Sequence, residues 1–229
     1  MTTYFTNKTF AFIRELARNN DRDWFKARKD RFETDVREPA LDFIEDFGKE
    51  LKKVSKHFNA DPRPVGGSLF RIQRDTRFSK DKTPYKTHVG IHFRHFATRE
   101  DVHAPGFYLH LEPAGASFAG VGLWQPETKN AYAIRAKIDD EATRWKRATR
   151  SASFAGTYTL EGDALVRPPK GYDEDHPLIE DLKRKDFLAT TKLKQSEITD
   201  PDFIRTYAKT VRTAGPFMKF LCEAVGVPY

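Results

Sequence analysis

The 229-residue sequence contains one cysteine, Cys222, and only two methionines. A single cysteine excludes an internal disulfide and any metal cluster held by several thiolates. It lies in the apolar run 217–222, where a thiol usually acts as a small buried hydrophobic group. No run approaches the ~20 apolar residues of a membrane span, and the N-terminal residues lack the apolar segment of a secretory signal. We therefore expect a cytoplasmic protein with no membrane partner.

Several catalytic motifs are missing as well. The sequence has neither of the glycine-rich phosphate-binding patterns, no H-E-x-x-H zinc motif and no G-x-S-x-G nucleophile elbow. Acidic residues are too scarce around the most basic stretch to form the carboxylate pair of a glycosidase. These absences leave binding, or chemistry, that uses arginine, lysine, aspartate, histidine and tyrosine.

Large aromatic side chains are abundant, with 19 Phe, 8 Tyr and 3 Trp. They supply the area for a packed core although only 38% of the residues are hydrophobic. A chain of this length can bury such a core in one domain. The formal net charge of +7 favours acidic partners, such as phosphorylated small molecules or nucleic acid.

The apolar periodicity predicts a single α+β domain, residues 1–229, with three parts. Helical spacing over residues 1–60 predicts N-terminal helices, the first capped by Thr6 or Asn7. Alternation within residues 68–124 predicts a central antiparallel sheet, and the mixed part 126–229 adds C-terminal helices. Helices and strands each have one apolar face, so we expect the N-terminal helices to pack on one face of the sheet.

Finer patterns predict the individual strands. Alternation predicts four strands that form an antiparallel meander, near residues 69–73, 88–94, 106–112 and 117–124. Further along, turn residues predict a hairpin around Gly162, and residues 187–193 should be extended. Gly120 and Gly122 in the fourth strand indicate either a close approach of two backbones or a bulge.

The stretch from Leu69 to Phe96 carries the strongest functional signal. Between two alternating segments it gathers six basic residues, Arg71, Arg74, Arg77, Lys80, Lys82 and Lys86. Pro84 and the shortage of apolar residues there predict an ordered polar loop. Guanidinium groups bind planar oxyanions through paired hydrogen bonds, and lysines add point charges. We therefore expect this loop to bind a phosphorylated or otherwise anionic small molecule, or to support chemistry on it. The predicted anion-binding residues are Arg71, Arg74, Arg77, Lys82 and Lys86.

Two other interpretations of the loop stay open. Ion pairs with Asp75 and Asp81, the only acids in the loop, would make it a purely structural charge clamp with no ligand. Basic charge with aromatic residues on a sheet would also suit a nucleic-acid-binding module, although no RNA-binding aromatic motif is present. The sequence does not indicate an oligomeric state.

Three residues are candidates for a catalytic role if the protein is an enzyme, which the sequence leaves undecided. They are Asp75, Tyr85 and His110. The arginines on both sides of Asp75 should favour its ionised form, and they could orient the carboxylate so that it acts as a general base. Tyr85 could donate a hydrogen bond to a bound oxyanion, or it could be a packed loop aromatic.

The seven histidines are dispersed along the chain. His88 and His92 point to one face of a single strand but lie roughly 13 Å apart, which is too far to share an ion. A site formed by His110, Glu112 and Asp175 is the one metal alternative that stays open. We otherwise expect no metal site and no cofactor.

The basic loop also contains a motif that resembles the signature of a mostly bacterial family, with fungal members, classed as a domain of unknown function: Arg71-x-x-Arg74-Asp75-x-Arg77-Phe78-x-x-Asp81-Lys82-x-x-Tyr85. Four further segments are similar to the pattern of that family: Asn20-x-Arg22-Asp23-Trp24-Phe25, Gly120-x-Gly122-Leu123-Trp124-x-Pro126, Pro169-x-Gly171-Tyr172 and Asp175-His176-Pro177. They span most of the chain in the same order. The resemblance implies no particular activity and no cofactor.

Overall fold

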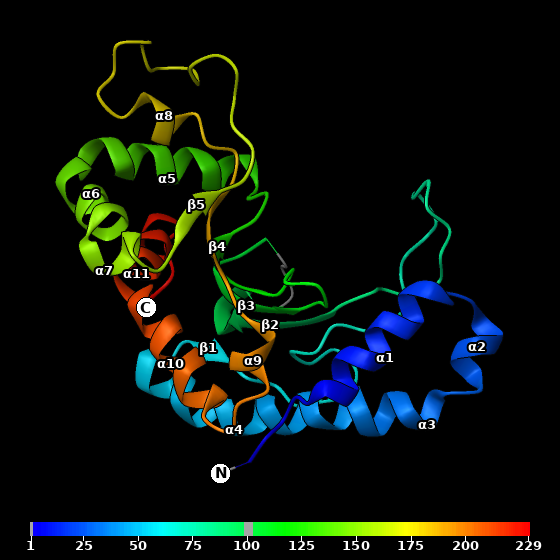
Figure 1. The fold of residues 1–229 in the computed structure, drawn as a ribbon. Coiled ribbons are helices and arrows are strands. Elements are labelled where there is room, and N and C mark those ends of the chain that lie inside the picture. Colours follow the sequence, from blue (N-terminus) through cyan, green and yellow to red (C-terminus); the bar gives the residue numbers. More distant parts are fainter. Residues whose placement is uncertain (1, 99–102) are drawn as a thin grey trace.

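The computed structural model describes residues 2–98 and 103–229, which form one α+β domain around a six-stranded antiparallel sheet (Figure 1). The order of the strands in the sheet is β1-β2-β3-β4-β6-β5. The strands are β1 (Phe58–Asn59), β2 (Val89–His95), β3 (Gly106–Leu111), β4 (Phe118–Leu123), β5 (Thr159–Glu161) and β6 (Phe187–Lys192). The predicted fold class is therefore confirmed.

The N-terminal part is helical, as predicted. Its elements are α1 (Asn7–Arg18), α2 (Arg22–Lys26), α3 (Lys29–Phe32), a π-helical turn (Glu33–Arg37) and α4 (Glu38–Val54). Thr6 caps α1 by accepting a hydrogen bond from the backbone N–H of Lys8. Asp21 caps α2 in the same way through the N–H of Trp24. The local capping chemistry thus determines where the first two helices begin.

Of the remaining helices, η2 connects β2 to β3 and the others follow β4. They are the 3₁₀ turn η2 (Phe96–Thr98), α5 (Thr128–Asp140), α6 (Ala142–Arg150), α7 (Ala152–Ala155), α8 (Ile179–Leu182), α9 (Gln195–Ile198), α10 (Phe203–Thr213) and α11 (Gly215–Ala224). Cys222 in α11 is fully buried, and burial raises the pKa of its thiol to about 12, as expected of a core residue. Within the described part of the chain, no helix is both long enough and apolar enough to cross a membrane.

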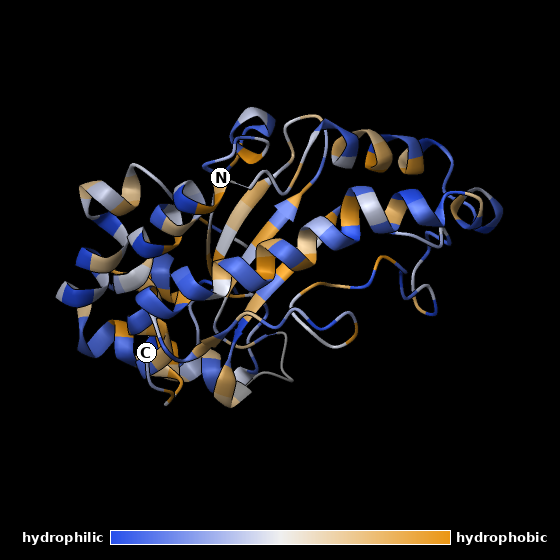
Figure 2. Ribbon diagram, turned by 90° about the horizontal axis from the view of Figure 1, so that it is seen from below, coloured by the Kyte–Doolittle hydropathy of each residue, from blue (hydrophilic) through white to orange (hydrophobic). Residues whose placement is uncertain are grey.

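Helices α4, α10 and α11 cover one face of the sheet. The ring of Phe93 in β2 lies 4.8 Å from the ring of Phe47 in α4 and 6.3 Å from that of Tyr207 in α10, measured between centroids. The alternate residues of β3 on this face, Phe107 and Leu109, are also fully buried. In Figure 2, hydrophobic and hydrophilic segments alternate along the helices in front of the sheet, as expected of helices with one buried face.

Two details of the predicted sheet are wrong. Residues 69–73 do not form a strand but make only isolated bridges, Leu69 with Ile91 and Gln73 with Tyr85. The reason is that the chain pairs with itself after Phe70, because the N–H of Lys86 donates to the carbonyl of Ile72. The predicted meander is therefore limited to β2, β3 and β4.

The predicted hairpin around Gly162 is also wrong. Strand β5 pairs with β6, and Ala164 forms a bridge with Arg184, so both sides of the turn pair with a later segment. The edge of β6 offers β5 a partner that lies far away in the sequence, and local turn residues cannot reveal it.

Candidate functional site

Residues 71–86, here called the basic arm, project from the sheet edge as a hairpin-like loop, teal in Figure 1. The side chain of Asn20 holds its base: Nδ2 donates to the carbonyl of Tyr85 (2.9 Å), and Oδ1 accepts from its N–H (3.0 Å). The buried ring of Tyr85 stacks on Phe25, with 4.2 Å between centroids. These contacts join the two motifs near residues 20–25 and 71–85. They favour a packing role for Tyr85.

Two of the predicted anion-binding residues hold the arm in shape. The Arg74 guanidinium forms an ion pair with Asp81 and donates to Oγ1 of Thr83 (2.8 Å). The amine of Lys82 donates to the backbone carbonyl of Thr76 (2.8 Å). These bonds cross-link the two sides of the hairpin, so the interpretation as a structural clamp describes Arg74 and Lys82 well.

A third predicted anion-binding residue, Arg77, is bound to the catalytic candidate Asp75. Two guanidinium N–H groups donate to the carboxylate at 3.0 and 2.7 Å. The hydrogen bonds from Arg77 lower the pKa of Asp75 to about 2, so the carboxylate stays charged at neutral pH. A carboxylate with so low a pKa is a weak base, and this geometry favours a structural role for Asp75.

The remaining two predicted residues, Arg71 and Lys86, differ from the other three. Among the residues that the structure describes, neither forms an ion pair with an acid. The amine of the half-buried Lys86 lies 5.2 Å from the ring centroid of Phe70. Burial and the positive charge of Arg71 both lower the pKa of Lys86. Arg71 and Lys86 therefore act on each other as two like charges where the arm leaves the sheet, and the nearby acid, Asp75, is already bound by Arg77.

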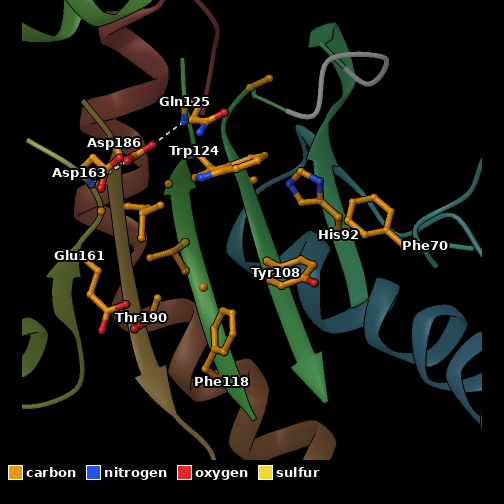
Figure 3. A pocket seen from close by; sticks show the side chains of 17 residues that line it. Phe70, His92, Tyr108, Phe118, Trp124, Gln125, Glu161, Asp163, Asp186 and Thr190 are labelled. Atoms are coloured by element: carbon orange, nitrogen blue, oxygen red, sulfur yellow. Dashed lines mark hydrogen bonds between the residues drawn. The ribbon is translucent and has the colours of Figure 1, made fainter. Parts of the chain in front are cut away.

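The face of the sheet opposite α4 and α10 holds a pocket of about 640 Å³ (Figure 3). Alternate residues of the strands point into it: Tyr108 from β3, Phe118 from β4 and Thr190 from β6. Phe70 and His92 form the wall nearest the arm. The lining side chains are mostly apolar or aromatic, which is typical of a small-molecule site. No sequence motif predicted this pocket, because it arises from alternate positions of separate strands.

Acidic residues lie at the opposite rim of the pocket, between β5 and β6 (Figure 3). Asp186 is buried and accepts hydrogen bonds from the backbone N–H groups of Gln125 (2.7 Å) and Asp163 (2.8 Å). It therefore ties the ends of β4 and β5 to the start of β6. The pocket has a basic edge near Phe70 and an acidic edge near Glu161, so a bound molecule would lie along a charge gradient.

His92 is held tightly in the pocket wall. Its ring lies directly on the backbone of Gly106, where an added Cβ would overlap the imidazole. Burial, reinforced by the positive charge of Arg94, lowers the pKa of His92 to about 3. The imidazole is therefore neutral at physiological pH and gives the pocket a polar but uncharged surface.

Three potential metal ligands, His88, His110 and Glu112, lie together. The ring of His110 stacks on Phe118, which lines the pocket, and His88 lies close to the arm. Nε2 of His110 is 2.9 Å from Oε2 of Glu112, and the rings of His88 and His110 are 4.3 Å apart. The catalytic candidate His110 thus lies beside Glu112, whereas Asp175, the third member of the predicted alternative, is not part of this group. Along its own strand His88 has no second metal ligand close by. The register of β2 with β3 places Glu112 opposite it.

A second pocket, of about 440 Å³, separates the arm from this histidine group. It is lined by Arg74, Asp75, Lys86, Thr87 and His88. The cations of the arm and the histidine group therefore face a common space, which borders the exposed face of the sheet through Phe70.

Fold and site together define a class of protein: a single-domain α+β protein that has one exposed sheet face edged by a basic arm. Within that class the chain belongs to the family of conserved hypothetical proteins (DUF2461), whose model matches residues 8–220. The resemblance drawn from the sequence motifs is thereby confirmed. Neither the comparison with curated proteins nor the comparison with solved structures gave a match. The name of the family implies no activity.

Proposed function

We propose that the protein binds an anionic small molecule, phosphorylated or carrying a carboxylate, on the exposed face of the sheet. Its anionic group lies between Arg71 and Lys86, and its apolar part lies in the pocket along Phe70 and Tyr108. The observation that carries this proposal is a pair of like charges, Arg71 and Lys86, with Lys86 beside the Phe70 ring that lines the aromatic pocket. Among the described residues, neither cation forms an ion pair with an acid.

Electrostatics favours an anion at this position. Repulsion between Arg71 and Lys86 makes the empty site costly, and it adds to burial, the larger cause, in lowering the pKa of Lys86. An anion between them would remove the repulsion and accept charge-assisted hydrogen bonds from both side chains. The neighbouring Phe70 ring limits access of water to Lys86, which strengthens such bonds.

The rest of the arm supports the site indirectly. The ion pair of Arg74 with Asp81 and the bonds from Asn20 to Tyr85 fix the hairpin before any ligand arrives. A fixed arm lowers the entropy that binding has to remove, so a small ligand can bind without ordering a loop. The structural clamp and the anion site are then two functions of one motif, performed by different arginines.

The proposal is tested by a thermal-shift screen of nucleotides, sugar phosphates, organic acids and inorganic phosphate. At least one monomeric anion is expected to stabilise the protein saturably, by about 2.7 kcal/mol at a concentration a hundred times its Kd. Moderate salt should weaken the effect only partly, because the site lies against the Phe70 ring. Failure of every anion to shift the unfolding transition would contradict the proposal.

The tip of the arm favours a second candidate, a nucleic-acid-binding module. Phe78 is 95% exposed and lies beside the Arg77 guanidinium, 5.8 Å from it, so a base could stack there. In that case gel-shift affinity should grow with the length of the nucleic acid, and its logarithm should fall linearly with the logarithm of salt concentration. A steep salt slope in the absence of any small-anion effect would favour this candidate.

A further inference from the structure

The group formed by His88, His110 and Glu112 has a geometry that the proposed anion site does not require. One ligand atom of each residue lies within 4.8 Å of the others. Antiparallel pairing produces this arrangement, because Val89 pairs with Leu111 and therefore places His88 opposite Glu112. All three side chains extend from the sheet face that also carries the pocket.

These distances are close to what a metal ion needs. Zinc binds imidazole nitrogen and carboxylate oxygen at about 2.0–2.2 Å, so two ligands of a tetrahedral ion lie roughly 3.4 Å apart. The contact between His110 and Glu112 is already 2.9 Å. Side-chain rotations that bring His88 closer by about an ångström would complete the set. The strands themselves do not have to move.

A further residue orients the central ligand. The hydroxyl of Tyr108 lies 3.3 Å from Nδ1 of His110, on the side of the ring opposite Glu112. Metal-binding histidines usually make such a hydrogen bond through the nitrogen that does not bind the ion. The bond directs the lone pair of Nε2 towards the space between Glu112 and His88.

We propose that His88, His110 and Glu112 bind one divalent transition-metal ion of the zinc type, with Tyr108 as a positioning residue. Two histidines and one carboxylate leave a coordination position open, as in catalytic rather than structural zinc sites. His88 also lines the pocket beneath the arm, so the open position faces the space next to Lys86. An ion there would bind water or an anion. The metal site itself is independent of the anion-binding proposal.

Zinc alone, added to the metal-free full-length protein, tests the site. Calorimetry is expected to show one ion per chain, and cobalt as a substitute probe should give the visible absorption of a site with nitrogen and oxygen ligands. Tyr108→Phe should weaken zinc binding roughly tenfold to a hundredfold. Removal of a direct ligand, in His110→Ala or Glu112→Gln, should weaken it further and abolish the cobalt spectrum.

His57→Gln is the matched control, since it removes a half-buried histidine that lies outside the group and should leave zinc affinity unchanged. Glu112→Gln keeps the size of the side chain, so it preserves the test if His110→Ala does not fold. No zinc binding by the parent protein would overturn the proposal. Binding that survives both Glu112→Gln and Tyr108→Phe would overturn it equally, because the ion would then lie elsewhere.

Discussion

Replacement of Gly122 by alanine is expected to destabilise the protein by roughly 3 kcal/mol or more. Gly122 in β4 has a φ of 120°, which side chains other than glycine rarely adopt. A Cβ there would overlap the carbonyl oxygen of Phe187 and lie 2.8 Å from Cα of Leu188. Both neighbours belong to the backbone of β6, which cannot shift without breaking its ladder with β4.

Urea unfolding of Gly122→Ala measures this effect, with Gly120→Ala as the control. At Gly120 an added Cβ would meet nothing closer than 3.5 Å, so the same change should cost far less. Because β6 carries Thr190 into the pocket, any Gly122→Ala protein that still folds should also bind ligands less well. Equal stability of the two variants would show that the close approach of β4 and β6 is not required.

Acidification is expected to destabilise the protein through His92, in a window between about pH 6.5 and pH 3. The folded state holds the pKa of His92 at about 3, against 6.5 for the free side chain. The unfolded chain therefore takes up a proton as the pH falls below 6.5, whereas the folded protein does not. The contribution of neutral His92 to the unfolding free energy is fully present above pH 6.5, and it is lost as the pH falls towards 3. At ~1.4 kcal/mol per pKa unit, the decrease in unfolding free energy that is due to His92 is at most about 5 kcal/mol.

Unfolding free energies measured from pH 8 to pH 4 by urea titration, for the parent and for His92→Gln, check this expectation. The variant should show a flatter dependence on pH below about 6.5. Burial also lowers the pKa of His88 and His95, so part of the slope should persist. Asp75, whose pKa is lowered to about 2, contributes a separate loss of stability only below about pH 4. An unchanged slope in the variant would contradict the assignment to His92.

Sequence patterns predicted the features that depend on neighbours in the chain. Thr6 caps its helix through a bond to the residue two positions away, so the sequence alone located the start of that helix. The alternation of apolar and polar residues located β2, β3 and β4, because every second residue of each strand faces the helices. This pattern also depends only on neighbours in the chain. Strand β6 was recognised as an extended segment, but nothing local indicated that it would pair with β4.

The candidate site was predicted only in part, because it depends on contacts between distant segments. The basic stretch identified the arm, but the separation of Arg71 and Lys86 from the paired Arg74 and Arg77 depends on where the acids lie in space. His88 was missed as a partner of Glu112, because spacing along one strand says nothing about the opposite strand.

In the proposed function the anion lies between Arg71 and Lys86, neither of which forms an ion pair with an acid among the described residues. Lys86→Met removes one of the two repelling charges and keeps the length of the apolar stem beside Phe70. Arg77→Ala is the control, since it removes an exposed arginine of the same arm that is already paired with Asp75.

The decisive measurement is the unfolding temperature of the parent, Lys86→Met and Arg77→Ala, each without ligand and with the most stabilising anion of the screen. Without ligand, Lys86→Met is expected to be at least as stable as the parent, because a repulsion is lost, and the anion should not stabilise it. Arg77→Ala should keep the full ligand effect. A Lys86→Met protein that is less stable than the parent, yet is stabilised by the anion to the same extent, would show that the anion does not bind at Lys86.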